Sequence, residues 1–182
     1  MLGGSFDPIH HGHLLAARTL REQLALDQVR LIPAAEQPFK TGRHGASAEH
    51  RARMAELAVG DEPGLAVDRL EVERPGPSYT VDTVEQYRAR WPEAGLTLLL
   101  GSDAAAEFPE WRKPERIREL VEVVVFTRAG SPDGEGASLV KVPCMDISAT
   151  EVRARVRAGR SIRYLVPDAV AAYIQKHGLY VA

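Results

Sequence analysis

Three of the six histidines of this 182-residue chain lie close together, at His10, His11 and His13. They follow a Gly-Gly pair and a proline-containing turn in the stretch GGSFDPIHHGH, and a helical pattern begins beside them. Glycines let a backbone approach a ligand closely, and the first turn of a helix offers unsatisfied N–H groups and a positive dipole end. Imidazoles at positions i and i+3 can face one side. The stretch therefore predicts a cradle for a polyphosphate.

Other interpretations of the histidines stay open. The spacing of His10 and His13 is compatible with a metal ion, although no further ligand motif accompanies them, and both could be surface residues of a turn. His11 lies between the other two, so we expect it to face elsewhere and to be structural. The chain has no GxxxxGK[ST], which excludes a P-loop, and no GxGxxG follows a strand, so the fingerprint of a dinucleotide oxidoreductase is missing.

A second polar cluster lies near the carboxy-terminal end of the chain. Ser148 precedes Glu151 by three residues, which is the spacing of a capping box at the start of a helix. Capping alone could explain this pattern. Ser148, Thr150 and the N–H groups of the first helical turn also form a nest for an anion, and Arg153 can present a bidentate guanidinium to a phosphate. Taken alone, these residues allow either interpretation.

The elements that must position these residues alternate along the chain. Apolar runs separated by amphipathic stretches are the pattern of a parallel α/β fold, and near-continuous apolar runs indicate strands covered on both faces. After a very short first strand, we expect strands at Val29–Pro33, Leu65–Val72, Leu96–Gly101, Val123–Arg128 and Leu139–Pro143. The expected helices are roughly His13–Ala25, Ala48–Ala58, Val81–Trp91, Arg116–Val121, Thr150–Ala158 and Asp168–His177.

Composition narrows the class of protein. With 23 basic and 25 acidic residues the net charge is −2, so a broad basic field is absent and nucleic acid is not an expected partner. The single cysteine, Cys144, excludes an internal disulfide and a multi-cysteine zinc site. No segment reaches about 18 apolar residues, and the start lacks the features of a signal peptide. We therefore expect a cytoplasmic protein without a membrane partner.

The length of the chain predicts a single domain over residues 1–182, with a small helical part from about residue 148.

The two polar clusters carry a family resemblance. The stretch Gly3–His13 resembles the GGxFDPxHxGH signature of the nucleotidyltransferases with a (T/H)xGH motif, and within them the bacterial nicotinate-nucleotide adenylyltransferases. Ile147–Arg153 is similar to their ISSTxxR motif, with Ala149 in place of a serine, and the likeness extends to Tyr180. The resemblance implies an α/β, Rossmann-like fold, doubly wound, with a mainly parallel sheet and helices on both faces. It also implies transfer of AMP from ATP to nicotinate mononucleotide, with release of pyrophosphate.

The resemblance further implies roles for individual residues, and the lack of a further ligand motif beside the histidines leaves no resident metal site among our expectations. Charge on the reacting phosphates would be offset by Mg²⁺ brought with ATP and by the catalytic residues His10, His13, Lys40 and Arg153. ATP would lie against Gly3, Gly4, Ser5, Phe6, His10, His13, Gly101, Asp103, Arg128, Ile147, Ser148, Thr150 and Arg153. Nicotinate mononucleotide would lie against Asp7, Lys40, Tyr79, Thr80, Thr83 and Trp111. Backbone amides of the family's SYTxDT segment would meet the nicotinate carboxylate, and the tryptophan would stack on the pyridine ring.

Some residues differ from the family's motifs, and other functions remain as alternatives to this interpretation. Phe39 stands where the family commonly has a histidine, so the role of that histidine is not carried over. Lys40 could be a solvated loop residue, Trp111 a core residue and Arg128 a surface residue. The rival functions are another nucleotidyltransferase of the same fold, specific for nicotinamide mononucleotide or phosphopantetheine, and a nucleotide-binding regulator that has lost catalysis. No KMSKS-like stretch supports an aminoacyl-tRNA synthetase fragment. The oligomeric state stays open, with a homo-oligomer as one option.

Overall fold

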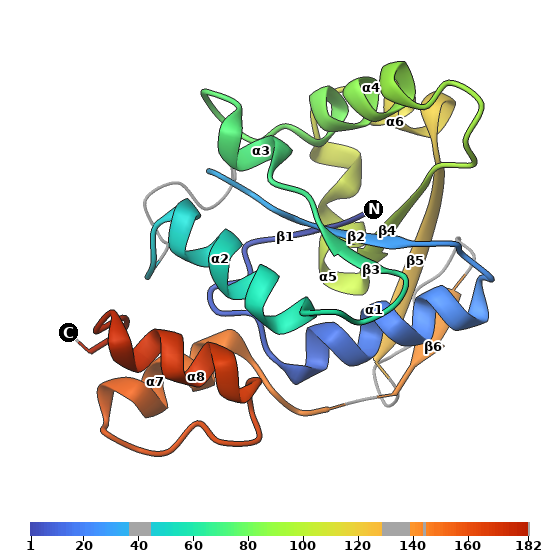
Figure 1. The fold of residues 1–182 in the computed structure, drawn as a ribbon. Helices are drawn as coiled ribbons and strands as arrows, with labels where there is room; N and C mark the ends of the chain where they lie inside the picture. The colour runs from blue at the N-terminus through green and yellow to red at the C-terminus, as the bar shows by residue number, and fades with distance from the viewer. Residues whose placement is uncertain (37–44, 129–138, 144, 182) are drawn as a thin grey trace.

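The computed structural model describes residues 1–36, 45–128, 139–143 and 145–181 (Figure 1). Strands and helices alternate through most of the chain, as the apolar pattern predicts. In chain order the elements are β1 (Leu2–Gly4), α1 (His11–Gln23), β2 (Val29–Pro33), α2 (Ala48–Val59), β3 (Leu65–Val67), α3 (Leu70–Glu73), α4 (Thr80–Arg90), β4 (Thr97–Gly101), α5 (Ser102–Glu107), the 3₁₀-helix η2 (Phe108–Glu110), α6 (Pro114–Leu120), β5 (Glu122–Arg128), β6 (Leu139–Val142), α7 (Ala149–Arg157) and α8 (Asp168–Lys176).

The strands form a parallel, doubly wound sheet. Parallel pairing joins β1 to β2, β2 to β3, β4 to β5 and β5 to β6. The Leu99 N–H donates to the Met1 carbonyl at 2.9 Å, and the Met1 amine donates to the Thr97 carbonyl at 2.7 Å, so β1 lies beside β4. The strand order is therefore β3-β2-β1-β4-β5-β6, which confirms the expected Rossmann-like architecture. Folds of this order bind ligands beyond the carboxyl ends of the strands, where the order reverses, here between β1 and β4.

The sheet separates two hydrophobic cores. Successive side chains of a strand point to opposite faces of a sheet. In β4, Leu99 faces a core that it shares with α1, α2 and α8, whereas Leu98 and Leu100 face a second core that includes α4 and α6. Figure 1 shows α1 and α2 on one side of the sheet and α4 and α6 on the other. The expectation of helices on both faces is confirmed.

The region expected as a strand at Leu65–Val72 is different in the structure, and that expectation was wrong. Only Leu65–Val67 pairs with β2, and the chain then turns into the short helix α3. Asp68 makes this turn: its N–H donates to the Leu31 carbonyl at 2.9 Å, and its Oδ1 accepts the Leu70 N–H at 3.0 Å. An aspartate that accepts a backbone N–H two residues later favours a turn over a continuing strand. The short helices α5 and η2 were not predicted, and the ends of the other predicted elements differ by at most two residues.

The carboxy-terminal helix α8 packs against α2, and α7 contributes to the same core. Val152 of α7 and Val170 and Ile174 of α8 join the same core as α1 and α2. At the contact between α8 and α2, the Tyr173 hydroxyl lies 2.9 Å from His50 Nδ1. This packing places the start of α7 next to the turn between β1 and α1. Within the described part of the chain, no helix has the length and apolar character needed to cross a membrane.

Candidate active site

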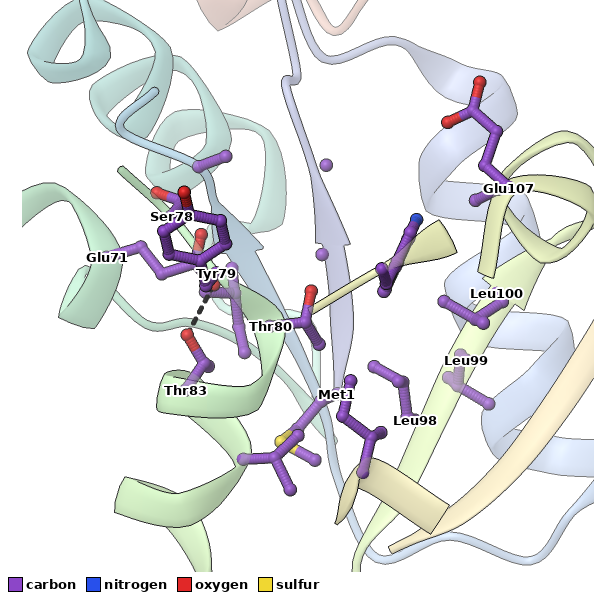
Figure 2. Close-up of a pocket in the computed structure, with 18 of the residues that line it drawn as sticks. Met1, Glu71, Ser78, Tyr79, Thr80, Thr83, Leu98, Leu99, Leu100 and Glu107 are labelled. Atoms are coloured by element: carbon purple, nitrogen blue, oxygen red, sulfur yellow. Dashed lines mark hydrogen bonds between the residues drawn. The ribbon is translucent and has the colours of Figure 1, made fainter. Parts of the chain in front are cut away.

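A cavity of about 590 Å³ lies along the face of the sheet that α4 and α6 cover and extends to the carboxyl ends of β1 and β4 (Figure 2). Gly3 and Gly4 at the end of β1 line one part of its wall, and Gly101 at the end of β4 lines another. The start of α4 contributes Tyr79 and Thr80. The cavity thus lies at the point of the sheet where the strand order reverses, which is the expected ligand position of this fold.

The turn after β1 depends on glycines for two different reasons. A Cβ on Gly4 would lie 3.0 Å from the Phe6 ring, and a Cβ on Gly12 would lie 3.1 Å from His10 Nδ1, so each glycine makes room for a ring. A Cβ on Gly3 would meet no protein atom within 4 Å, and Gly3 lines the cavity. Gly3 therefore keeps ligand space open, whereas Gly4 and Gly12 allow packing within the protein.

His10 and His13 face the same side of the start of α1, as their spacing predicts. Their rings stack with centroids 3.7 Å apart and an interplanar angle of 27°. His13 Nδ1 accepts the His10 N–H at 3.3 Å, so a neutral His13 carries its proton on Nε2 and can donate it to an anion. His11 lines a different groove, and its backbone N–H donates to the Leu165 carbonyl at 3.0 Å. The positive end of α1 and its imidazoles together suit a phosphate group.

The first turn of α7 meets this histidine motif. Ser148 caps the helix, because its Oγ accepts the Glu151 N–H at 3.1 Å, and Ile147 is buried beside it. Arg153 Nη2 donates to Thr150 Oγ1 at 3.2 Å, and Arg153 Nη1 donates across the fold to the Asp7 carbonyl at 2.7 Å. Residues 146 positions apart are thereby joined directly. The structure brings together the two motifs that the sequence presents separately.

The Asp7 side chain is buried and makes its hydrogen bonds within the protein. Its Oδ2 accepts the Gly45 N–H at 2.7 Å, and its Oδ1 accepts the Ala46 N–H at 3.1 Å and the Tyr180 hydroxyl at 2.8 Å. Burial, and then the Asp7 charge, raise the pKa of Tyr180 above its usual value, so the hydroxyl stays a donor. Contact between Asp7 and a bound nucleotide stays a prediction, and Tyr180 is a partner that the local sequence pattern did not indicate.

Arg51 fixes the backbone around the same turn. Its guanidinium is fully buried and donates to the carbonyls of Ser5 at 2.7 Å, Ala35 at 2.8 Å and Ala46 at 3.2 Å. Burial lowers the pKa of Arg51 from its usual value, while the Asp7 charge opposes that change. The catalytic candidate Lys40 lies outside the described residues, in the segment 37–44.

The start of α4 rests on a buried carboxyl group that the sequence did not single out. Thr83 Oγ1 donates to Glu71 Oε1 at 2.6 Å, the contact drawn as a dashed line in Figure 2, and accepts Arg74 Nη2 at 3.2 Å. Ser78 Oγ accepts the Ala35 N–H at 2.9 Å. Burial raises the pKa of Glu71, and hydrogen bonds from Thr83 and Ser78 partly oppose that rise. Glu71 lies in the region expected as a strand, and no feature of the neighbouring sequence indicated that its side chain would be buried.

Two neighbouring side chains line the cavity wall after η2. Trp111 packs edge-to-face on Phe108 with centroids 5.4 Å apart, and its indole Nε1 is buried without a hydrogen-bond partner among the described residues. The Arg112 guanidinium lies 4.8 Å from the centroid of the Tyr79 ring, which brings a positive charge to the wall. The sequence predicts Trp111 here and does not predict Arg112, because only the fold places it over Tyr79.

Two of the remaining candidates lie at the end of β4. Gly101 precedes α5, Asp103 belongs to its first turn, and both line the cavity. Arg128 is the last residue of β5, and its side chain lies outside the described part. Among the described residues, no three His, Cys, Asp or Glu side chains are grouped so that they could hold a metal ion.

Comparisons with known proteins agree with this geometry. The cytidylyltransferase-like family model matches residues 1–155. A "probable nicotinate-nucleotide adenylyltransferase" of Roseiflexus sp. (strain RS-1) is 47% identical over 192 residues, covering 99% of this chain and 96% of the relative. A relative of the same name from Thermus thermophilus is 47% identical over 183 residues, with 99% and 97% covered.

A solved structure shows the same fold at low sequence identity. The Plasmodium falciparum nicotinic acid mononucleotide adenylyltransferase complexed with NaAD superposes with a TM-score of 0.82 at 18% identity, covering 98% of this chain and 95% of that one. The relatives at 47% identity match almost their whole length and carry one enzyme name. This chain belongs to the nicotinate-nucleotide adenylyltransferase family, within the cytidylyltransferase-like enzymes.

Proposed function

We propose that this chain performs its family's reaction at the cavity between β1 and β4, joining ATP and nicotinate mononucleotide into nicotinate adenine dinucleotide and pyrophosphate. One observation carries the proposal: the contact between Arg153 and Asp7 joins the two predicted phosphate-binding motifs, and Gly3 and Gly4 of the first motif line this cavity. A polyphosphate held between the start of α1 and the start of α7 would place its α-phosphate toward the cavity. ATP would reach the part of the cavity at Gly3, Gly4 and Gly101, and the second substrate would occupy the part at Tyr79, Thr80 and Trp111.

The chemistry needs positioning more than acid–base groups. The 5′-phosphate of the mononucleotide is already an anionic nucleophile near neutral pH. Its oxygen forms a bond to the α-phosphorus of ATP as the bond to the bridging oxygen of pyrophosphate breaks. The enzyme's part is to align two polyanions and to offset charge on the leaving group. We assign this part to the catalytic residues His10, His13, Lys40 and Arg153. No covalent intermediate is required.

The rest of each substrate is placed by the walls of the site. ATP would contact Gly3, Gly4, Ser5, Phe6, Gly101, Asp103, Arg128, Ile147, Ser148 and Thr150 in addition to the catalytic histidines and Arg153. Nicotinate mononucleotide would contact Asp7, Lys40, Tyr79, Thr80, Thr83 and Trp111. The first N–H groups of α4, at Thr80 and Val81, lie where a helix supplies no internal acceptor. Such donors at a positive helix end favour a carboxylate over an amide.

Family members use a divalent metal together with ATP, and we propose Mg²⁺ for this chain. The described residues present no grouped carboxylates or histidines for a resident ion, so the ion would enter as the magnesium complex of ATP. Mg²⁺ commonly keeps several waters and takes its other ligands from substrate phosphates. The ion is thus part of the substrate.

We also infer that the chain acts as one domain. The core around α1 and α2 includes Leu2 at one end of the chain and Ile174 and Tyr180 at the other, so the carboxy-terminal helices share that core. Contiguous burial of this kind is typical of a single folding unit. The cytoplasmic location and the lack of a nucleic-acid or membrane partner stay predictions of the sequence, and the oligomeric state stays open.

The reaction is tested by pyrophosphate release from ATP and Mg²⁺ with three acceptors in parallel: nicotinate mononucleotide, nicotinamide mononucleotide and phosphopantetheine. We expect strong release with the first acceptor and little with the others. Preference for the amide would keep the chemistry and overturn the role given to the start of α4. No release with any acceptor, from folded protein that still binds ATP, would favour the regulator.

A further inference from the structure

We propose that Tyr180 is a positioning residue for adenylyl transfer, which acts through Asp7 to hold Arg153 beside the phosphates of ATP. The inference rests on the proposed function, because it takes these phosphates as the ligand of Arg153. Tyr180 lies four residues after the end of α8 and far from both motifs in the sequence. Its contact with Asp7 spans 173 positions of the chain.

The contact is buried and joins three segments. The Tyr180 hydroxyl donates to Asp7 Oδ1 at 2.8 Å, and both side chains are less than a tenth exposed. Arg153 Nη1 donates to the Asp7 carbonyl at 2.7 Å and lies 4.0 Å from Asp7 Oδ2. A single residue, Asp7, therefore bonds the end of the chain through its carboxylate and α7 through its backbone.

Packing restricts Arg153 on the same side. A Cβ on Gly45 would lie 2.9 Å from the Tyr180 ring and 3.0 Å from Arg153 Cδ, so the ring and the aliphatic stem of the arginine flank one backbone position. Thr150 Oγ1 accepts a further hydrogen bond from Arg153. The stem is thus held between the Tyr180 side of the site and the first turn of α7.

Electrostatics explain why the hydroxyl matters for Arg153. A carboxylate with few donors would draw a guanidinium into a close bidentate pair, which is the preferred geometry of the two groups. Here Gly45, Ala46 and Tyr180 supply donors to the Asp7 oxygens, and Arg153 bonds the Asp7 carbonyl instead. A guanidinium has five N–H donors, and those beyond the two bonds described remain for a phosphate. Loss of the Tyr180 hydroxyl would let Arg153 turn toward the carboxylate.

The test compares Tyr180→Phe with a matched control, Tyr87→Phe. Tyr87 is also buried, and its hydroxyl also donates to a carboxylate, Asp68 Oδ2, at 2.6 Å, on the other side of the sheet from α7. Both variants lose one buried hydrogen bond and are expected to have a lower Tm. Only Tyr180→Phe should lower kcat/KM for ATP, by about 10-fold, because small displacements of a positioning group cost rate. The KM for nicotinate mononucleotide should change less than about twofold, because the Asp7 carboxylate keeps the N–H donors of Gly45 and Ala46 and no residue that lines the cavity is changed.

A second measurement separates positioning from general loosening of the fold. In an Arg153→Ala background, adding Tyr180→Phe should cause no further loss in kcat/KM for ATP, because the residue through which Tyr180 acts is gone. Equal losses in the two backgrounds, or equal losses for Tyr87→Phe and Tyr180→Phe, would overturn the proposal.

Direct ATP binding, measured by calorimetry on the same variants, distinguishes the two hypotheses. If the parent releases no pyrophosphate with nicotinate mononucleotide, the proposed function fails. In that case Arg153-dependent weakening of ATP binding by Tyr180→Phe would still support the positioning role, and unchanged binding would contradict it.

Discussion

The candidate site has two ends that differ in structure: one is predicted to bind the phosphates of ATP, and the other the acceptor substrate. At the phosphate end, polar side chains already bond to one another: the His10 and His13 rings stack, and Arg153 bonds to Asp7, which accepts the hydroxyl of Tyr180. At the acceptor end, leucines of β4 and Trp111 line one part of the cavity of about 590 Å³, and polar side chains such as Tyr79, Thr80 and Arg112 line another. The phosphate end is thus a network of polar groups that hold one another in place, whereas the acceptor end is a cavity.

This difference follows from what each end would bind. Triphosphate oxygens carry charge that changes during the reaction, and donors fixed before the reaction stabilise such charge without reorganising. A pyridine ring presents mostly a flat apolar face, which an aromatic wall can contact. Substitutions at the phosphate end should therefore lower the rate, and substitutions at the acceptor end should mainly weaken binding of one substrate.

The largest expected effect is that of His13→Ala. Removing one preorganised donor from a developing charge costs about 100-fold or more in kcat, and His13 also supports the His10 ring. His11→Ala is the matched control, because His11 lies in the same helix turn and lines a different groove. Steady-state pyrophosphate release measures both variants. An equal loss of kcat in the two variants would contradict the catalytic role given to His13.

A smaller effect is expected for Gly3→Ala, which separates ligand space from packing. The added methyl group would meet no protein atom within 4 Å, so the free energy of unfolding should hardly change while kcat/KM falls about 10-fold by obstruction of bound substrate. Gly95→Ala is the control, since its added methyl group also meets no atom, away from the cavity. Full activity of Gly3→Ala would show that substrate does not approach this strand end.

Trp111→Phe tests the acceptor end. The smaller ring keeps an aromatic face, so the KM for nicotinate mononucleotide should rise by about 3- to 10-fold, the range of aromatic pair energies. The KM for ATP and the value of kcat should change little. The other tryptophan, Trp91, packs on Tyr87 and lies outside the cavity lining, so Trp91→Phe serves as the control. A drop in kcat without a change in KM would contradict the division of the site.

The smallest effect concerns how the free energy of unfolding depends on pH through Glu71, the buried carboxyl group that contacts the start of α4. Burial raises the pKa of Glu71 above 4.5, so the folded state holds this proton more tightly than the unfolded state does. The stability that follows is fully present below about pH 4.5 and is lost as the pH rises through the raised pKa. Relative to the parent, Glu71→Gln should therefore gain stability as the pH increases. Urea unfolding between about pH 4 and 8 measures this difference, and a flat difference would contradict it.

Local patterns in the sequence determined a large part of this protein. The histidine pair and the Ser148 cap depend on neighbours a few residues away, and the structure confirms that the His10 and His13 rings share one side and that Ser148 caps the helix. The alternation of apolar runs and amphipathic stretches likewise predicts most strands and helices, because burial on a helix or strand face repeats with a fixed period. Trp111 follows the carboxyl end of a strand and lines the cavity, and its contact with a substrate stays a prediction.

Only the tertiary structure decided which groups support these motifs. Asp68 ended the strand predicted to reach Val72 because it bonds to Leu31 and Leu70, and the partners of Asp7 include Tyr180 at the other end of the chain. The burial of Glu71 depends equally on how α3 packs. No short-range pattern encodes such contacts. They form only when the sheet and its two cores bring distant segments together, since a buried polar group must find its hydrogen-bond partner wherever the fold provides one.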